Sequence, residues 1–178
     1  MRKSIILLLG LLICGSAVAG VKPGVIPPDY LGKTVTGKPV HLSALRGKIV
    51  VISFWATWCH YCLKELPTLA GLQSIATRRG LRMQVVAVDY EEPRRTFVHN
   101  AHILKPRLPG LLLTWDGDGR IGKPYGVTGL PFMVMLHGDG TVAYVHIGYD
   151  ESELDTLFKE INELLNEPVT HPDAKAGG

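Results

Sequence analysis

The sequence has 178 residues, of which 46% are hydrophobic and 20% charged, and its 19 basic and 16 acidic residues give a formal charge of +3. A chain of this length can bury the core of one globular domain and is too short for two large ones. The charge is too small and too dispersed to indicate a nucleic-acid partner. With only three cysteines, the protein cannot depend on a dense disulfide framework.

The N-terminus has the pattern of a secretory signal peptide. Arg2 and Lys3 precede an apolar run over residues 5–14, and Ala17-Val18-Ala19 then forms a cleavage site of the A-x-A type. We therefore expect residues 1–19 to be a signal peptide and the mature protein to be periplasmic.

Cleavage would remove Cys14 and leave two thiols in an oxidising compartment. The alternatives are an uncleaved membrane anchor, for which the apolar run is short, and lipidation of Cys14. Ile13 is a poor fit before a lipidated cysteine, so we favour cleavage.

Alternating strands and helices follow. Residues 49–55 form a β-branched and aromatic run without polar alternation, which predicts a strand buried on both faces. Residues 59–79 carry apolar side chains at helical spacing, Gly80 is a stop signal, and residues 82–89 form a second buried run. A helix between two strands makes a right-handed crossover, so these strands should be parallel.

Hairpins and a terminal helix complete the pattern. Strand-like pieces within residues 31–42 flank Thr36-Gly37-Lys38, and two more strands flank residues 137–140; both are hairpin signals. Residues 150–165 form an amphipathic helix. The polar tail over residues 166–178, with its prolines and glycines, should be disordered.

The chemistry is expected at Cys59-His60-Tyr61-Cys62. Two cysteines three positions apart at the start of a helix can close a disulfide within one turn. The unpaired N–H groups and positive dipole end of the helix stabilise a thiolate at the first cysteine. Cys59 should therefore attack a target and Cys62 should resolve the mixed disulfide.

A cysteine pair at this spacing can also belong to a structural zinc site or form a purely structural disulfide. A structural zinc site needs four ligands, and the chain without its signal peptide has no further cysteine to supply them. A purely structural bridge closing so small a loop would remove little chain entropy. We expect redox chemistry that needs no metal and no organic cofactor.

The block from Phe54 to Cys62, continued by Glu65, Pro67 and the downstream Gly129-Leu130-Pro131, resembles the thioredoxin superfamily and, more closely, its TlpA/ResA-like thiol-disulfide oxidoreductases. The resemblance covers about residues 28–165. It implies an α/β thioredoxin fold over residues 20–165, with a central mixed sheet flanked by helices and an N-terminal β-hairpin extension. It also implies action on substrate proteins that carry disulfides or thiols, and a membrane-embedded electron donor that regenerates the dithiol. We expect the protein to be a monomer.

The same resemblance assigns further site residues. Leu130 and a cis Pro131 should lie against the dithiol and, with Trp58, position the target chain; X-Pro is the bond for which cis is least costly. Many thioredoxins have a buried aspartate where this chain has Ser53. Glu92 is the best match to the glutamate that some TlpA/ResA-type reductases use instead, although it could simply open the next helix.

The direction of electron flow is left open by His60 and Tyr61. A partly charged imidazole beside the thiolate would stabilise the reduced form and raise the reduction potential. A disulfide reductase is favoured, with a disulfide donor or isomerase as the alternative. A thiol peroxidase is disfavoured because Ala56 stands where peroxiredoxins have threonine, and a redox-inert binding module is the alternative of another class.

Overall fold

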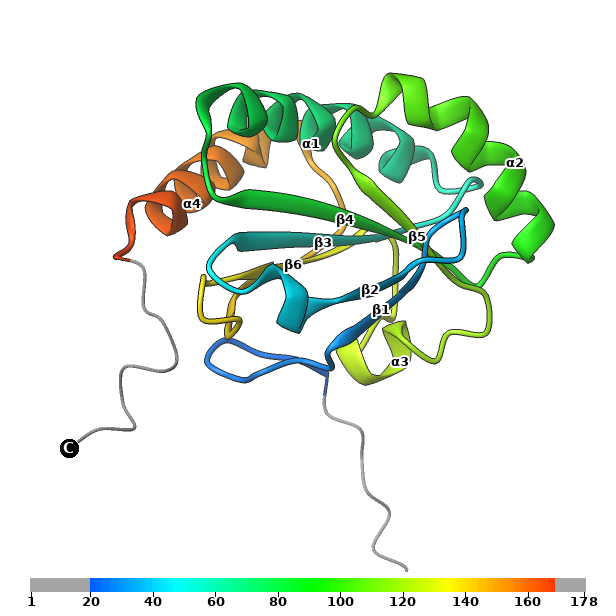
Figure 1. The fold of residues 1–178 in the computed structure, drawn as a ribbon, viewed down its shortest axis with the longest axis horizontal. Helices are drawn as coiled ribbons and strands as arrows, with labels where there is room; N and C mark the ends of the chain where they lie inside the picture. The colour runs from blue at the N-terminus through cyan, green and yellow to red at the C-terminus, as the bar shows by residue number, and fades with distance from the viewer. Residues whose placement is uncertain (1–19, 169–178) are drawn as a thin grey trace, which may run out of the picture.

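The computed structural model describes residues 20–168, so the predicted signal peptide and the tail beyond residue 168 lie outside the described residues. A seven-stranded sheet forms its centre, in the order β2-β1-β5-β4-β3-β6-β7 (Figure 1). The strands are β1 (Tyr30–Lys33), β2 (Pro39–His41), β3 (Ile49–Trp55), β4 (Met83–Tyr90), β5 (Leu112–Asp116), β6 (Phe132–Leu136) and β7 (Val142–Ile147).

Helices cover both faces of the sheet. Those longer than three residues are α1 (His60–Arg79), α2 (Arg94–Leu104), α3 (Gly122–Tyr125), α4 (Leu154–Asn166) and a 3-10 helix at Leu42–Leu45. Short 3-10 turns at Lys105–Arg107 and Glu151–Glu153 follow α2 and precede α4. Figure 1 shows α1, α2 and α4 on one face and α3 on the other. Within residues 20–168, no helix is both long and apolar enough to cross a membrane.

The sheet is mixed, as predicted. β3, β4 and β5 are parallel, whereas β6 pairs with β3, β7 with β6 and β1 with β5 in antiparallel register. Every residue of β3 is buried, which explains its uninterrupted apolar run. Both predicted hairpins are confirmed, since β1 pairs with β2 and β6 with β7.

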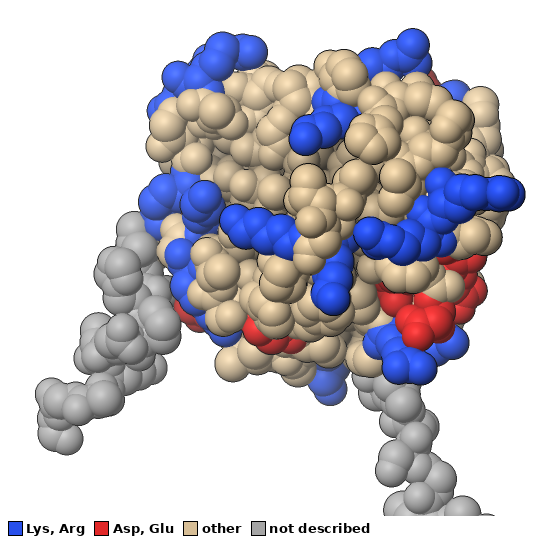
Figure 2. All heavy atoms as spheres, turned by 45° about the vertical axis from the view of Figure 1, so that its right-hand side comes forward, with Lys and Arg blue, Asp and Glu red and all other residues tan. Residues whose placement is uncertain are grey.

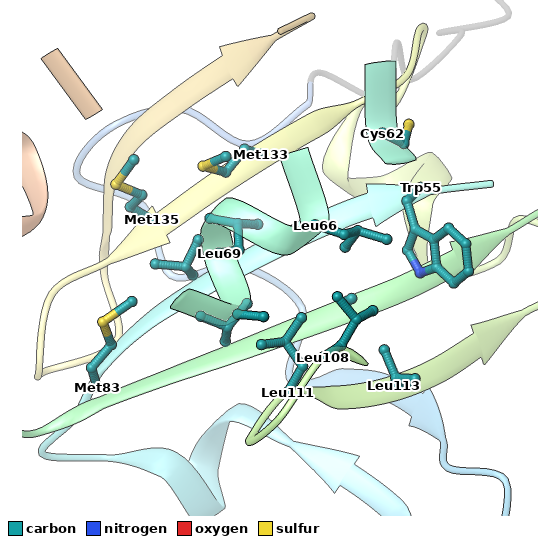
Figure 3. Packing of buried hydrophobic residues seen from close by; sticks show 14 of the residues in the cluster. Trp55, Cys62, Leu66, Leu69, Met83, Leu108, Leu111, Leu113, Met133 and Met135 are labelled. Atoms are coloured by element: carbon teal, nitrogen blue, oxygen red, sulfur yellow. The ribbon is translucent and has the colours of Figure 1, made fainter. Parts of the chain in front are cut away.

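Two apolar layers form the core. One lies between the sheet and α1, α2 and α4, and the other lies on the α3 side. In Figure 3, Leu66 and Leu69 of α1 pack over the strands, with Trp55 at the end of the layer near Cys62. The reactive end of α1 is therefore anchored by the larger layer.

The ends of α1 match their sequence signals. Cys59 caps the N-terminus, and Gly80 ends the helix with φ of 64°, where its N–H bonds the carbonyls of Ala76 and Thr77. The apolar face is narrower than the sequence spacing indicated, because Leu63 and Ile75 are exposed. At the other end of the chain, α4 extends one residue into the predicted tail, to Asn166.

Candidate active site

Cys59 and Cys62 form a disulfide at the point where β3 leads into α1. The S–S distance is 2.07 Å, and the two Cα atoms are 5.3 Å apart. Cys59 is 6% exposed and Cys62 fully buried, so a partner reaches Cys59 first. The backbone N–H of Cys62 donates to Cys59 Sγ over 3.2 Å, which places this sulfur at the positive end of the helix. A Cys59 thiolate would be stabilised there.

The turn before Cys59 is held by Glu92, which lies in the connection between β4 and α2. The backbone N–H of Thr57 donates to Glu92 Oε2 over 2.7 Å, and the Thr57 hydroxyl donates to Oε1 over 2.5 Å. Trp115 Nε1 donates to the Glu92 carbonyl over 2.8 Å. Glu92 is 4% exposed and lies outside α2, which has Pro93 as its N-cap. Its carboxylate therefore positions the Cys59 turn, while its expected redox role stays a prediction.

Replacing Glu92 by alanine should lower the free energy of unfolding by about 2–3 kcal/mol, because it leaves two donors of a partly buried turn without their acceptor. Glu92→Gln keeps one amide oxygen and should lose less. Glu151→Ala is the matched control, since it breaks only the exposed pair with Lys64 and should cost less than about 1 kcal/mol. Urea unfolding measures all three, and equal small losses would contradict the positioning role.

A second buried carboxyl lies below Cys62 on α1. Glu65 is 1% exposed, and the Ser53 hydroxyl donates to its Oε2 over 2.6 Å. Burial raises the pKa of Glu65 to about 7, against the smaller opposing effect of the Ser53 hydrogen bond. The chain thus places a buried carboxyl against the Ser53 hydroxyl, one helical turn after Cys62.

Asp89 adds a third buried acid, at the end of β4. Its Cα pairs with those of Trp55 in β3 and Trp115 in β5, so it lies on the sheet beside the disulfide turn. Burial, followed by the nearby carboxylates of Glu92 and Asp116, raises the pKa of Asp89 to about 8. Asp89 therefore holds its proton to a higher pH than an exposed aspartate does, which limits the negative charge buried under the turn.

The loop before β6 reaches the same end of the sheet. The Leu130–Pro131 bond is cis, as predicted. Phe54 pairs with Phe132, so the antiparallel register places Pro131 beside Trp55 and the start of the Cys59 turn. The Pro131 carbonyl already accepts from Gly148 N over 2.8 Å. Within residues 20–168, no backbone hydrogen bond involves residues 128–130, so the loop that contains Leu130 has backbone groups available to pair with a partner chain.

Aromatic side chains surround the entrance to Cys59. Trp58 is 70% exposed and Tyr61 56% exposed, and the His60 and Tyr61 rings meet edge to face with centroids 5.9 Å apart. A hollow of about 350 Å³ lies next to them and is lined by Tyr61, Lys64, Tyr149, Asp150 and Glu151. Exposed aromatic rings are suited to contact a polypeptide, because they offer large apolar area at small entropic cost.

The sequence alone assigned no site role to Glu65, Thr57 or Asp89. A signal was present: Glu65 is three positions after Cys62 and directly precedes Leu66, so it falls on the apolar face of α1. In the part of the chain that the structure describes, no group of three or more histidine, cysteine or acidic side chains is arranged to hold a metal ion.

A mixed α/β sheet with a helix-capping disulfide and an adjacent cis-proline loop defines a thioredoxin-like thiol-disulfide oxidoreductase. The chain belongs to the Redoxin family, whose model matches residues 22–165. This membership confirms the predicted thioredoxin fold and thiol-disulfide oxidoreductase activity.

Individual relatives agree with this assignment. Thiol-disulfide oxidoreductase ResA of Bacillus subtilis is 31% identical over 143 residues, covering 79% of this chain and 77% of the relative. Thiol:disulfide interchange protein DsbE of Yersinia pestis is 34% identical over 140 residues, with 72% and 70% coverage. A solved structure described as a DsbE protein of Chlorobium tepidum superimposes with a TM-score of 0.71 at 27% identity, covering 82% of this chain and 99% of that one.

Proposed function

We propose that this protein is an exported disulfide reductase in which Cys59 is the nucleophile, Cys62 resolves, and Trp58 with the Leu130–Pro131 loop positions the target. The observation that carries the roles of the two cysteines is the position of the more accessible sulfur, Cys59, at the N-terminal cap of α1. A thiolate stabilised there attacks readily at neutral pH.

The reaction proceeds in two exchanges. The Cys59 thiolate attacks one sulfur of the target disulfide, forms a mixed disulfide and releases the other target sulfur as a thiolate, which takes up a proton. Cys62 then loses its proton and attacks Cys59 Sγ, which releases the second target sulfur and leaves the Cys59–Cys62 disulfide. Two electrons pass to the target, and a membrane-embedded electron donor restores the dithiol.

Glu65 is suited to accept the proton of Cys62 in the second exchange. Both side chains are buried on the same face of α1, three residues apart, where solvent water cannot easily serve as the base. A pKa near 7 lets the carboxyl accept and return a proton at physiological pH. Glu92 supports the same chemistry by fixing the Thr57 turn, while His60 and Tyr61 modulate the thiolate from outside.

Export rests on the signal-peptide pattern of residues 1–19. A structural relative, described as an exposed lipoprotein thioredoxin of Streptococcus pneumoniae, shows 25% identity and a TM-score of 0.61, with 76% of this chain and 99% of that one covered. Cell fractionation of the full chain, together with N-terminal sequencing of the mature protein, tests this part. A chain starting at Gly20 outside the cytoplasm is the expected result.

The direction of electron flow is tested by the reduction potential of the Cys59–Cys62 couple and by trapping its redox state in the cell. We expect a potential nearer to thioredoxin, about −270 mV, than to the oxidant DsbA, about −120 mV, and a mainly reduced population. A mainly oxidised population with a potential near DsbA would identify a disulfide donor and overturn the reductase assignment.

A further inference from the structure

A cationic hollow opens beside the active site, where the N-terminal hairpin meets β5 and α2. It encloses about 470 Å³ and is lined by Tyr30, Lys33, Gly37, Arg94, Trp115 and Gly117. Lys33 of β1 lies opposite Trp115 of β5 in the antiparallel register. The Arg94 guanidinium carbon lies over the Trp115 ring, 5.6 Å from its centroid. We call this feature the Trp115 hollow.

The positive charge of the Trp115 hollow is not neutralised within the described residues, because neither Lys33 nor Arg94 has a carboxylate within 4 Å. The acidic residues on neighbouring loops are already paired: Asp29 with His41, Asp118 with Arg120, and Glu91 with Lys123. Lys33 and Arg94, which both lie beside the Trp115 ring, therefore lack an anionic partner among the described residues.

The positive surface continues past the hairpin. A second, apolar hollow of about 240 Å³ is bordered by Lys38, His102 and Lys105, and no acidic residue lines it within the described part of the chain. Figure 2, which brings the right-hand side of Figure 1 forward, shows lysine and arginine side chains in a band across this face, with acidic residues gathered at its lower right. The positive charge therefore extends over this face and is not confined to Lys33 and Arg94.

Hydrogen bonds connect the Trp115 hollow to the reactive cysteine. Trp115 donates to the Glu92 carbonyl, and the Glu92 carboxylate binds Thr57, two residues before Cys59. The Trp115 hollow and the Cys59 turn are therefore held to the same residue, Glu92, so residues that flank a target cysteine lie on the side of the active site where Arg94 contacts Trp115.

We propose that the Trp115 hollow binds an acidic segment next to the target disulfide and so gives the oxidoreductase a preference for substrates with Asp or Glu beside the reacting cysteine. Arginine stacked on an aromatic ring suits this task, since its planar guanidinium pairs with a carboxylate while its face remains on the ring. The proposal rests on the proposed thiol-disulfide exchange at Cys59.

The test measures how fast the reduced protein reacts with three peptides that differ only in the residues flanking one cysteine, held as a mixed disulfide with a small fluorescent thiol. The flanks are glutamate, glutamine or lysine. We expect the glutamate peptide to react about tenfold faster than the lysine peptide at low salt. This ratio should shrink towards one at high salt, since exposed charges are screened.

Variants then locate the preference. In the double variant Lys33→Gln/Arg94→Gln the ratio should fall to within about twofold, whereas Arg94→Lys, which keeps the charge, should retain most of it. Arg78→Gln/Arg79→Gln is the matched control, because these arginines lie in the last turn of α1, about 30 Å along the helix from the cysteines. It should leave the ratio unchanged.

Several outcomes would overturn the proposal. These are an equal rate for glutamate and lysine peptides, a ratio that survives in the double variant, and binding to phosphatidylglycerol vesicles without any peptide preference. A small uncharged disulfide provides the separate check on the exchange reaction, since it should react equally with every variant. Failure to reduce that compound would contradict the proposed function itself.

Discussion

Replacing Cys59 by serine should lower the rate of disulfide exchange by about a thousandfold or more, because the variant lacks the thiolate that attacks the target. The structure gives this role to Cys59 on access and electrostatics: it is the less buried of the two sulfurs, and it caps α1. The measurement is reduction of a protein disulfide by the fully reduced variant, followed over time.

Cys62→Ser is the matched partner of this experiment. Cys59 should still attack, but without a resolving thiol the mixed disulfide should accumulate as a stable covalent complex, visible by mass spectrometry without reductant. If the Cys59→Ser variant formed a mixed disulfide on Cys62 at a comparable rate, the assigned roles of the two cysteines would be reversed. Peroxide turnover that survives Cys62→Ser would instead support the thiol peroxidase alternative.

Glu65 should make the stability of the protein depend on pH in the direction opposite to that of a salt-bridged carboxylate. Its pKa rises from 4.5 to about 7 on folding, so between these values the folded state holds a proton that the unfolded chain has lost. Stability from this group is therefore fully present below about pH 4.5 and falls as pH rises to 7. The loss amounts to about 3 kcal/mol.

Glu65→Gln isolates this effect, because the amide oxygen can still accept from Ser53 while the group no longer ionises. The variant should match wild type in free energy of unfolding at pH 4.5 and exceed it by up to about 3 kcal/mol at pH 8. Urea titrations at the two pH values measure the difference. Equal stabilities at both would contradict the buried, neutral carboxyl.

The same variant should slow the second exchange. Without a base next to Cys62, resolution of a preformed mixed disulfide should fall about a hundredfold, while the first attack by Cys59 is nearly unchanged. Ser53→Ala is the companion variant: it removes the hydrogen bond that lowers the Glu65 pKa, so the pH midpoint of resolution should move upward. An unchanged midpoint would mean that Glu65 is not the base.

Much of the fold could be predicted because its signals are local. β3 has the predicted boundaries, and the helix before Gly80 ends where a left-handed residue is needed. The redox role of the cysteine pair could also be predicted, because the spacing of the two cysteines and their position at the start of a helix are visible in adjacent residues. The cis bond at Pro131 was expected from resemblance and is present.

What escaped prediction depends on contacts between distant segments. Ser53 and Glu65 meet only because β3 and α1 pack face to face, and Thr57 meets Glu92 across 35 positions of sequence. Acidic residues are favoured at the start of a helix, so a place in the first turn of α2 was the simpler prediction for Glu92. The fold instead uses its carboxylate to cap the turn of another connection.

The N-terminal hairpin has a consequence for how the protein tolerates unfolded partners. An exposed strand edge invites pairing with any extended chain, and β5 would be such an edge without β1 and β2. The new edge, β2, has only three residues and begins with Pro39, which has no N–H to offer. The opposite edge, β7, is partly covered, because Val142 exchanges backbone hydrogen bonds with Gly24 and Val25. Its Tyr144 and His146 side chains also bond Glu163 and Glu160 of α4. The borders of the sheet therefore offer an extended partner chain little backbone to pair with, which fits the proposed pairing at the Leu130 loop next to the disulfide.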